Sequence, residues 1–237
     1  MSKVPTQLTD GSSSRFRNAG PMVEINVGSG KSKMKYLVYK NFATYFSPVF
    51  DRAFNGKFME AKTQTYSIDD FEFPDAFALV VKWMYSKSLG TGWGDPDEEQ
   101  VTVEDLCRVW VLGDRLMMPE LQDCASSSLC YRITLRVDHG PHPLAAAAWI
   151  YEETGPNSPL RRLFAAKCAY ELRWGHGITS DEYELPDQFA ADIGSVYQRD
   201  AISCRNGHNC NDNGWANPPF EVLNHHHYKV NVAPTGC

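Results

Sequence analysis

The sequence has 237 residues, of which 43% are hydrophobic and 12% aromatic, so it can form a sizeable core and wholesale disorder is excluded. The formal net charge is −6, whereas nucleic-acid-binding proteins usually carry an excess of basic residues. This negative charge also gives no reason to expect an anionic membrane surface as a target. No signal-peptide core and no stretch long enough to span a membrane is present, which favours an intracellular protein of the cytoplasm or nucleus. In such a reducing compartment, four cysteines within predicted helices act as small buried hydrophobic residues: Cys107, Cys124, Cys130 and Cys168.

The N-terminal part of the chain predicts a tail followed by a β-hairpin. Residues 1–21 are rich in Ser, Thr, Gly and Arg and show no period, as is typical of a disordered tail. Apolar and polar residues then alternate over 23–27 and again over 34–38. This alternation predicts two half-buried strands joined by a Gly-rich turn.

The hairpin turn contains Gly30-Lys31-Ser32, which is similar to the end of a phosphate-binding loop. That motif needs a glycine five residues before Gly30, where this chain has Ile25, and a helix after Ser32. A strand is predicted there instead. The pattern therefore favours a hairpin turn over a nucleotide site.

The stretch from residue 40 to 85 predicts helix, strand and helix. Ser47 is positioned to cap a helix that begins at Pro48, and we expect Gly56 to end it in the left-handed conformation. Residues 65–68 read as a short strand, and Pro74 opens the next helix. The predicted apolar stripe of that helix is Phe77, Val80, Val81, Met84 and Tyr85.

The order and spacing of several short segments in this stretch resemble the BTB/POZ domain family, in particular its fungal branch. The segments are Lys40, Ser47-Pro48-Val49-Phe50, Ala53-Phe54-Asn55-Gly56, Phe58, Glu60-Ala61, Thr63-Gln64-Thr65 and Val81-Lys82-Trp83-Met84-Tyr85. The resemblance implies an α+β fold, in which a small β-sheet is covered by a helical cluster and followed by a mostly helical C-terminal extension. It also implies a protein-interaction module without catalytic activity.

The chain after residue 90 predicts an acidic loop and then helices. The loop, 90–100, carries carboxylates but lacks the spacing of an EF-hand, so a solvated loop is favoured over a calcium site. Thr102 and Asp105 form a predicted capping box, and Pro119 opens a second helix. The expected buried face of the first helix is Leu106, Val109, Trp110, Gly113, Leu116 and Met117. The run 111–122 resembles the last helical hairpin of the BTB fold, which implies that Asp114 and Arg115 orient the hairpin.

Three further helices are predicted, over 144–151, after the cap Ser158-Pro159, and after Pro186. Parts of this extension, at 151–154 and 158–162, also resemble fungal BTB proteins. We expect Arg161 and Arg162 to be exposed helix charges or members of local ion pairs. The residues expected together in one core are Phe50, Phe54, Phe77, Val81, Leu106, Val109 and Leu116.

We divide the chain into a disordered tail (1–21), a BTB/POZ domain (22–135), a helical extension (136–200) and an irregular Cys/His-containing tail (201–237). In the last segment, thiolate and imidazole groups are candidate ligands of a structural zinc ion, although their spacing fits no standard finger. The alternative is a loop with reduced thiols. The candidates are Cys204, His208, Cys210 and His225. Asp138, His139 and His142 lie in a predicted loop where solvent exposure is favoured over a catalytic or metal role.

The resemblance implies two partner-binding surfaces. Members that act as adaptors contact a cullin through a hydrophobic-x-Glu motif. In this chain, Phe58-Met59-Glu60 stands at the position of that motif, and cullin-3 is the partner that the resemblance implies. The alternative is that Phe58 packs under its loop. Members also form homodimers through the first strand and first helix, here 23–27 and 41–46. The aromatic residues of that helix are Phe42, Tyr45 and Phe46.

Three residues depart from the family pattern. Tyr39 replaces a usual His, and Ala43 replaces a Leu. Phe46 stands where an Arg is frequent, and it adds either a buried contact or an exposed apolar patch.

The resemblance is compatible with two functions: a substrate adaptor of a cullin-based ubiquitin ligase, and an oligomerising scaffold or transcriptional co-regulator. No nucleophile–base pair, phosphate loop or metal triad supports an enzyme. We expect no separate substrate-binding domain, which weakens the adaptor interpretation and leaves the extension at 144–197 as its candidate substrate surface.

Overall fold

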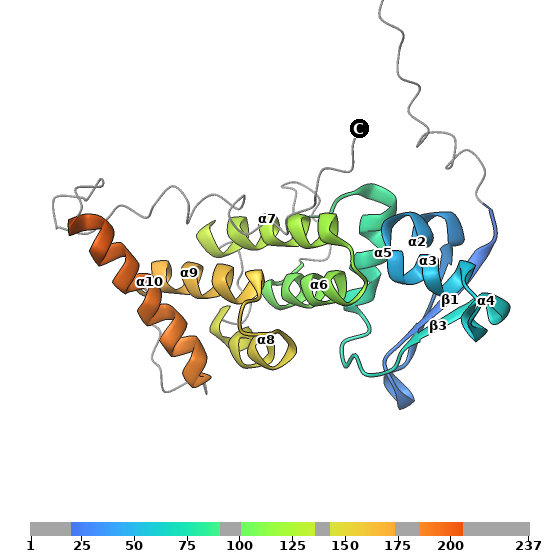
Figure 1. Ribbon diagram of the computed structural model, residues 1–237, viewed down its shortest axis with the longest axis horizontal. Coiled ribbons are helices and arrows are strands. Elements are labelled where there is room, and N and C mark those ends of the chain that lie inside the picture. The colour runs from blue at the N-terminus through green and yellow to red at the C-terminus, as the bar shows by residue number, and fades with distance from the viewer. Residues whose placement is uncertain (1–19, 91–100, 136–142, 174–184, 206–237) are drawn as a thin grey trace, which may run out of the picture. The chain divides into compact units, whose positions relative to one another are not determined.

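The computed structural model describes residues 20–90, 101–135, 143–173 and 185–205 (Figure 1). The chain forms two compact units, residues 1–85 (unit 1) and 86–237 (unit 2). The predicted acidic loop and the loop with Asp138, His139 and His142 lie largely or wholly outside the described residues.

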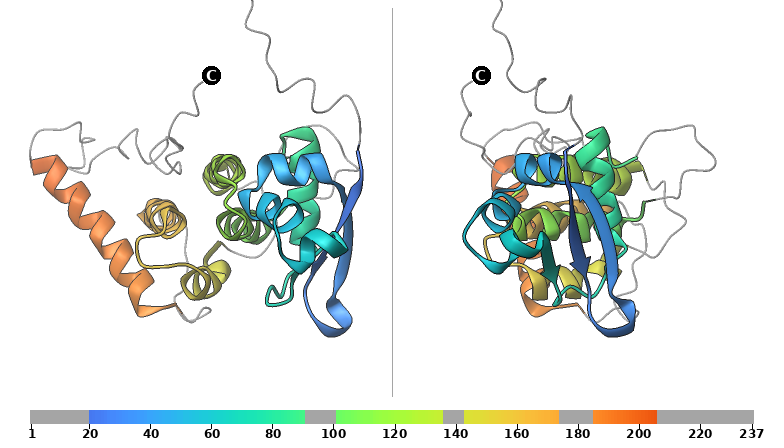
Figure 2. Two further views of the ribbon diagram at one scale, coloured as in Figure 1. Left: turned by 45° about the vertical axis from the view of Figure 1, so that its right-hand side comes forward. Right: turned by 90° about the vertical axis from the view of Figure 1, so that its right-hand side faces the viewer.

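Unit 1 contains a three-stranded sheet of order β2-β1-β3, built from β1 (Met22–Val27), β2 (Met34–Tyr39) and β3 (Thr65–Ile68). Strand β1 is antiparallel to β2 and parallel to β3. The predicted hairpin is therefore confirmed, and β2 follows the short 3-10 turn η1 (Gly30–Ser32) where a phosphate-binding loop would need a helix. Figure 2 shows the helices of this unit on one face of the sheet, which buries the alternate residues Val23, Ile25 and Val27.

Four helices complete unit 1: α2 (Lys40–Phe46), α3 (Pro48–Asn55), α4 (Met59–Thr63) and α5 (Ala76–Ser86). The predicted cap of α3 is confirmed, because the Ser47 hydroxyl oxygen accepts a hydrogen bond from the backbone N–H of Phe50 at 3.1 Å. Phe50 and Phe54 of this helix are buried and their rings stack at 5.8 Å. Phe77 of α5 packs edge-on against Phe50, so the aromatic residues of α3 and α5 form the centre of this core.

The prediction for α5 was partly wrong. Phe77, Val80 and Met84 are buried, but Val81 is only half-buried and Tyr85 is 43% exposed. Trp83 is buried instead. Because most positions of this helix are apolar, with Lys82 and Ser86 as exceptions on one face, its periodicity leaves a wide apolar arc and does not identify which part of it faces the core.

Gly56 follows α3 as predicted, but not in the left-handed conformation, since its φ is −81°. A Cβ atom at this position would lie 2.2 Å from the carbonyl oxygen of Arg52. Close approach to the preceding helical turn, rather than a positive φ, is therefore what requires glycine here.

Unit 2 is helical in the part of the chain that the structure describes. It consists of α6 (Val103–Arg115), α7 (Pro119–Leu135), the 3-10 turn η2 (Pro143–Ala146), α8 (Ala147–Glu153), α9 (Pro159–Arg173) and α10 (Asp187–Arg205). The predicted capping box is confirmed: Thr102 accepts from the backbone of Asp105, and the Asp105 carboxylate accepts from the backbone of Thr102. Within the α6–α7 hairpin, the indole N–H of Trp110 donates to the Ser126 hydroxyl at 3.1 Å.

The end of α6 differs from the prediction, which placed Met117 on the buried face. Met117 has φ +54° and is 50% exposed, whereas Met118 is buried. The N–H of Met118 donates to the carbonyl of Gly113 at 2.7 Å, and the N–H of Met117 donates to that of Asp114 at 3.1 Å. This pair of bonds is a Schellman motif, which turns Met117 outward and returns Met118 to the core.

Arg161 also differs from the prediction, because it is a buried side chain that is only 7% exposed. Its guanidinium donates to the carbonyl oxygens of Tyr151 and Thr154 and to the hydroxyl of Thr154. It also lies 4.4 Å from the centre of the Tyr151 ring. Arg161 thus closes the C-terminal end of α8 from the first turn of α9, while Arg162 is exposed as expected.

The residues predicted to share one core are divided between the units. Phe50, Phe54 and Phe77 are buried in unit 1, and Leu106, Val109 and Leu116 are buried in unit 2. Of the four helical cysteines, Cys107, Cys130 and Cys168 are buried, Cys124 is half-buried, and all four are free thiols. Within the described residues, no helix is both long and apolar enough to cross a membrane.

Candidate partner-binding surfaces

The end of the α3–α4 loop and the start of α4 place two large apolar side chains in solvent. Phe58 is 68% exposed and Met59, the next residue, is 65% exposed. Phe58 is the N-cap residue of α4, and Glu60 lies in the first turn of the same helix. The loop therefore presents an exposed aromatic ring next to a carboxylate, and we call Phe58, Met59 and Glu60 the α4 surface.

The backbone on both sides of the α4 surface is held by unit 1. On one side, Gly56 lies against the last turn of α3, and a Cβ atom added to it would lie 3.7 Å from the Phe58 ring. On the other side, the Gln64 side-chain amide donates to the carbonyl oxygens of Phe54 and Ala61, at 3.1 and 2.7 Å. Its backbone carbonyl accepts from Glu24 of β1. The exposure of Phe58 thus arises from a fixed loop rather than from a chain end.

Electrostatically, the α4 surface is mixed. Lys57 and Lys62 are exposed beside Phe58, while Glu60 is half-buried. Burial raises the pKa of the Tyr66 hydroxyl, and the carboxylates of Glu60 and Asp70 raise it further. Tyr66 therefore adds no charge at physiological pH, and Glu60 is the one acidic residue within residues 57–62.

A second candidate surface is formed by aromatic residues of α2 and α5, which we call the aromatic cluster. The Phe46 ring lies 5.2 Å from that of Trp83, and the Phe42 ring lies 4.7 Å from that of Tyr85. Tyr45 packs edge-on against Phe46 at 4.8 Å and is 46% exposed. The Phe46 departure from the family pattern is therefore a packing contact with α5, and the exposed members of the cluster are Tyr45 and Tyr85.

The entry to α2 is fixed by two further contacts. The hydroxyl oxygen of Tyr85 accepts a hydrogen bond from the backbone N–H of Tyr39 at 3.0 Å. Lys40 donates from its ammonium group to the carbonyl of Phe54 at 3.0 Å. Tyr39, which replaces the usual His of the family, thus brings no imidazole to the start of α2, but its ring still packs against Tyr85 of α5.

The other half of the expected dimer surface, residues 23–27, is arranged differently. Strand β1 is the central strand of the sheet, paired on one edge with β2 and on the other with β3. It therefore has no free edge for a second chain over residues 24–27. Of the two segments expected to support self-association, only the helix 41–46 presents exposed side chains suited to it.

The candidate zinc ligands are not brought together by the part of the chain that the structure describes. Cys204 lies in the last turn of α10, and its side chain is not described. His208, Cys210 and His225 lie outside the described residues, as do Asp138, His139 and His142. Among described residues, no group of three His, Cys, Asp or Glu side chains has a metal-binding arrangement.

Two buried thiols have surroundings that suppress nucleophilic chemistry. Burial raises the pKa of Cys107, with the nearby Cys168 adding to the effect. Burial also raises the pKa of Cys130. Because the thiolate is the reactive form, both side chains act as apolar packing groups at neutral pH.

A match to a known protein family covers both candidate surfaces. Residues 15–133, about half of the chain, match the BTB/POZ domain family. No curated protein matches the chain. The matched range contains the whole sheet, helices α2 to α6 and nearly all of α7, together with both candidate surfaces. The chain therefore belongs to the BTB/POZ domain family of protein-interaction modules.

Proposed function

We propose that this BTB protein is a non-enzymatic substrate adaptor that binds the N-terminal region of a cullin, cullin-3, through the α4 surface. The observation that carries the proposal is the 68% exposure of Phe58, which argues against packing of this ring under its own loop. An exposed aromatic side chain on a fixed backbone can fill an apolar pocket of a partner at low entropic cost. Glu60 then adds a charge-assisted hydrogen bond at the rim of that pocket.

The test measures binding of a cullin N-terminal fragment to the unmutated protein and to two variants, by isothermal titration calorimetry at tens of micromolar. The double variant Phe58→Ala, Glu60→Lys should abolish binding and leave the melting temperature nearly unchanged, because both side chains contribute little to the core. The matched control is Leu37→Ala, which removes another exposed apolar side chain of unit 1, 57% exposed on β2. Absence of binding by the unmutated protein would reject the adaptor proposal in favour of a scaffold.

The alternative function is a homo- or hetero-oligomerising scaffold or a transcriptional co-regulator. It is supported by the aromatic cluster, in which Tyr45 and Tyr85 expose 46% and 43% of their surface next to half-buried Phe42. Sedimentation velocity at tens of micromolar should show a dimer that Tyr45→Glu converts to monomer. A monomer in the unmutated protein would count against self-association through this helix.

We assign 22–135 to the BTB domain and 136–200 to an extension that carries the substrate, in an intracellular protein of the fungal branch. The metal content of the purified protein tests the zinc hypothesis for the 201–237 tail. One zinc ion per chain that is lost in the Cys204→Ser, Cys210→Ser variant would support it.

A further inference from the structure

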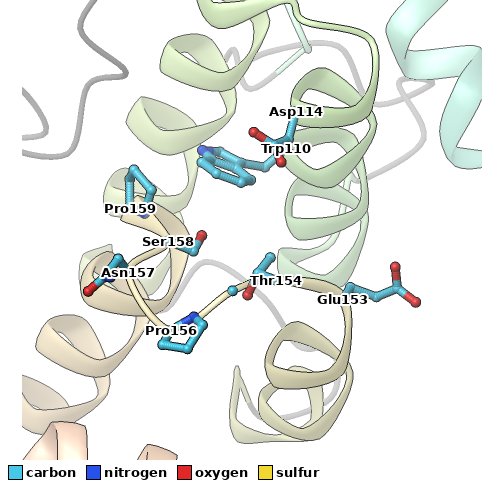
Figure 3. A pocket seen from close by; sticks show the side chains of 9 residues that line it. Trp110, Asp114, Glu153, Thr154, Pro156, Asn157, Ser158 and Pro159 are labelled. Carbon is cyan, nitrogen blue, oxygen red and sulfur yellow. The ribbon is translucent and has the colours of Figure 1, made fainter.

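Unit 2 contains a cavity of about 400 Å³ between α6 and the turn that joins α8 to α9 (Figure 3). Trp110 and Asp114 of α6 line one side, and Glu153 and the turn residues 154–159 line the other. This volume suits a single long side chain or a small molecule. All of these residues belong to unit 2, so the cavity is separate from the α4 surface and the aromatic cluster.

The cavity is anionic. Figure 3 shows the Asp114 carboxylate beside the indole of Trp110, whereas the Glu153 side chain points outward. Glu153 is neutralised by Arg115, whose guanidinium lies 2.6 Å from its carboxylate. Asp114 is exposed and accepts one hydrogen bond on its Oδ1 atom, from the Gln122 amide at 3.2 Å. None of the described residues that line the cavity is basic, so Asp114 supplies an uncompensated negative charge.

The turn that faces Asp114 is held in place. The Arg161 guanidinium fixes the carbonyl and hydroxyl of Thr154, and the N–H of Ser158 donates to the carbonyl of Gly155 at 3.0 Å. The Ser158 hydroxyl in turn accepts from the backbone of Leu160 at 3.2 Å. A binding cavity with walls fixed in this way loses little conformational entropy when it is filled.

We propose that this cavity binds the guanidinium group of an arginine side chain presented by a protein partner. A planar guanidinium matches a carboxylate with two parallel hydrogen bonds. Asp114 Oδ2 and the open lone pairs of Oδ1 accept its N–H groups. Trp110 is only 2% exposed, so it offers the apolar stem a narrow edge of the indole and no ring face. The Asn157 side-chain amide stands at the rim as a further polar contact.

The first experiment uses the full chain and two peptides of the same shape, acetyl-Gly-Arg-Gly-amide and its citrulline analogue, in which an uncharged ureido group replaces the guanidinium. Chemical-shift changes of ¹⁵N-labelled protein should map to the indole of Trp110 and to residues 154–158 for the arginine peptide. The citrulline peptide, which has the same shape without the charge, should bind at least tenfold more weakly. Equal shifts with both peptides, or shifts elsewhere, would overturn the proposal without requiring any protein variant.

The second experiment removes the charge of Asp114. Asp114→Asn keeps an oxygen to accept from Gln122 and should weaken arginine-peptide binding about tenfold, as expected for one charge-assisted hydrogen bond. The matched control is Glu152→Gln, which removes the same charge from an exposed neighbour that does not line the cavity. Equal weakening by both variants would show a long-range charge effect and overturn the assignment of Asp114. Neither variant touches the α4 surface probed by the cullin titration, so the two proposals fail separately.

Discussion

The two units close their helix ends in different ways. In unit 1, the Lys40 ammonium and the Gln64 amide both donate to the carbonyl of Phe54, and Gln64 itself has a left-handed φ of +54°. In unit 2, α6 ends in a backbone Schellman motif in which Met117 has the same φ and a side chain that is half exposed. The end of α8 is closed by the buried Arg161.

The comparison shows that one backbone conformation can be maintained for different reasons. A left-handed residue other than glycine costs about 1–2 kcal/mol. At Gln64 this cost is offset by two side-chain hydrogen bonds, which also fix the loop that exposes Phe58. At Met117 the backbone bonds alone offset it. The helix ends therefore differ in how much stability depends on a particular side chain, and substitutions can measure this.

The largest expected effect is at Arg161. Arg161→Ala should lower the free energy of unfolding by about 3 kcal/mol, because it leaves the carbonyl oxygens of Tyr151 and Thr154 without their charged donor in a buried site. Urea denaturation followed by circular dichroism measures the loss. Arg162→Ala, one residue further along α9 and exposed, is the control and should change stability by less than about 0.5 kcal/mol. Equal losses in the two variants would contradict the role of Arg161.

The sequence predicted much of this fold, because its signals are local. The hairpin alternation, the Ser47 cap, the capping box of Thr102 and the helix starts at Pro48 and Pro119 each depend on residues a few positions apart. Arg161 could not be predicted in the same way. Its role depends on the carbonyls of a different helix, which come within reach only after α8 and α9 pack together.

For the candidate surfaces, the sequence predicted the positions of the residues but not all of their exposures. The position of Phe58 followed from the family resemblance, but its exposure depends on Gln64 and Gly56, which fix the loop through α3. The exposure of Met59 was not predicted, because this residue stands at the unspecified middle position of the hydrophobic-x-Glu motif. Tyr85 was assigned to the buried stripe, although its hydroxyl accepts from Tyr39 and keeps the ring at the surface. Such contacts join residues far apart in the sequence, and hydrophobic periodicity carries no information about them.

The next prediction concerns the free energy of unfolding and distinguishes Gln64 from Met117, the two left-handed residues compared above. Gln64→Gly should lower the free energy of unfolding by about 1 kcal/mol, since relief of the backbone strain only partly offsets the loss of two hydrogen bonds. The same variant should weaken binding through the α4 surface, because the loop would lose its attachment to α3. Urea denaturation and the cullin titration measure the two effects. An increase in stability would show that the Gln64 side chain contributes nothing.

The same substitution in unit 2 should have the opposite sign. Met117→Gly removes a Cβ from a left-handed position and loses little packing, because the side chain is 50% exposed. Removal of the strain exceeds the added entropy of the unfolded chain, so stability should rise by about 0.5 kcal/mol. Met117→Ala, which keeps the Cβ, is the control and should not stabilise. A loss of stability in Met117→Gly would mean that the Met117 side chain packs in solution.

The smallest expected effect concerns a charge that, unlike Arg161, remains at the surface. The Glu24 carboxylate on β1 lies 2.8 Å from the Lys35 ammonium of β2 and accepts from the Asn26 amide at 2.9 Å. The hydrogen bond from Lys35, followed by that from Asn26, lowers the pKa of Glu24 below its ordinary value of 4.5. A carboxylate with a lowered pKa in the folded state stabilises the protein above the unfolded-state pKa. This contribution is lost as the pH falls through the folded-state value.

Glu24→Gln should therefore lower the melting temperature slightly at pH 7, and the difference from the unmutated protein should shrink below pH 4.5 and vanish in stronger acid. Exposed pairs of this kind contribute little and are screened by salt, so the difference at pH 7 should also decrease in about 1 M NaCl. Thermal melts at neutral pH, near the ordinary pKa of 4.5 and in stronger acid, with and without salt, measure both dependences. A difference that persists in acid would mean that Glu24 acts through packing or through its neutral form. The Glu24 result would then not measure the loss of a charge-assisted hydrogen bond at the surface, and its comparison with the buried Arg161 would report only the difference in burial.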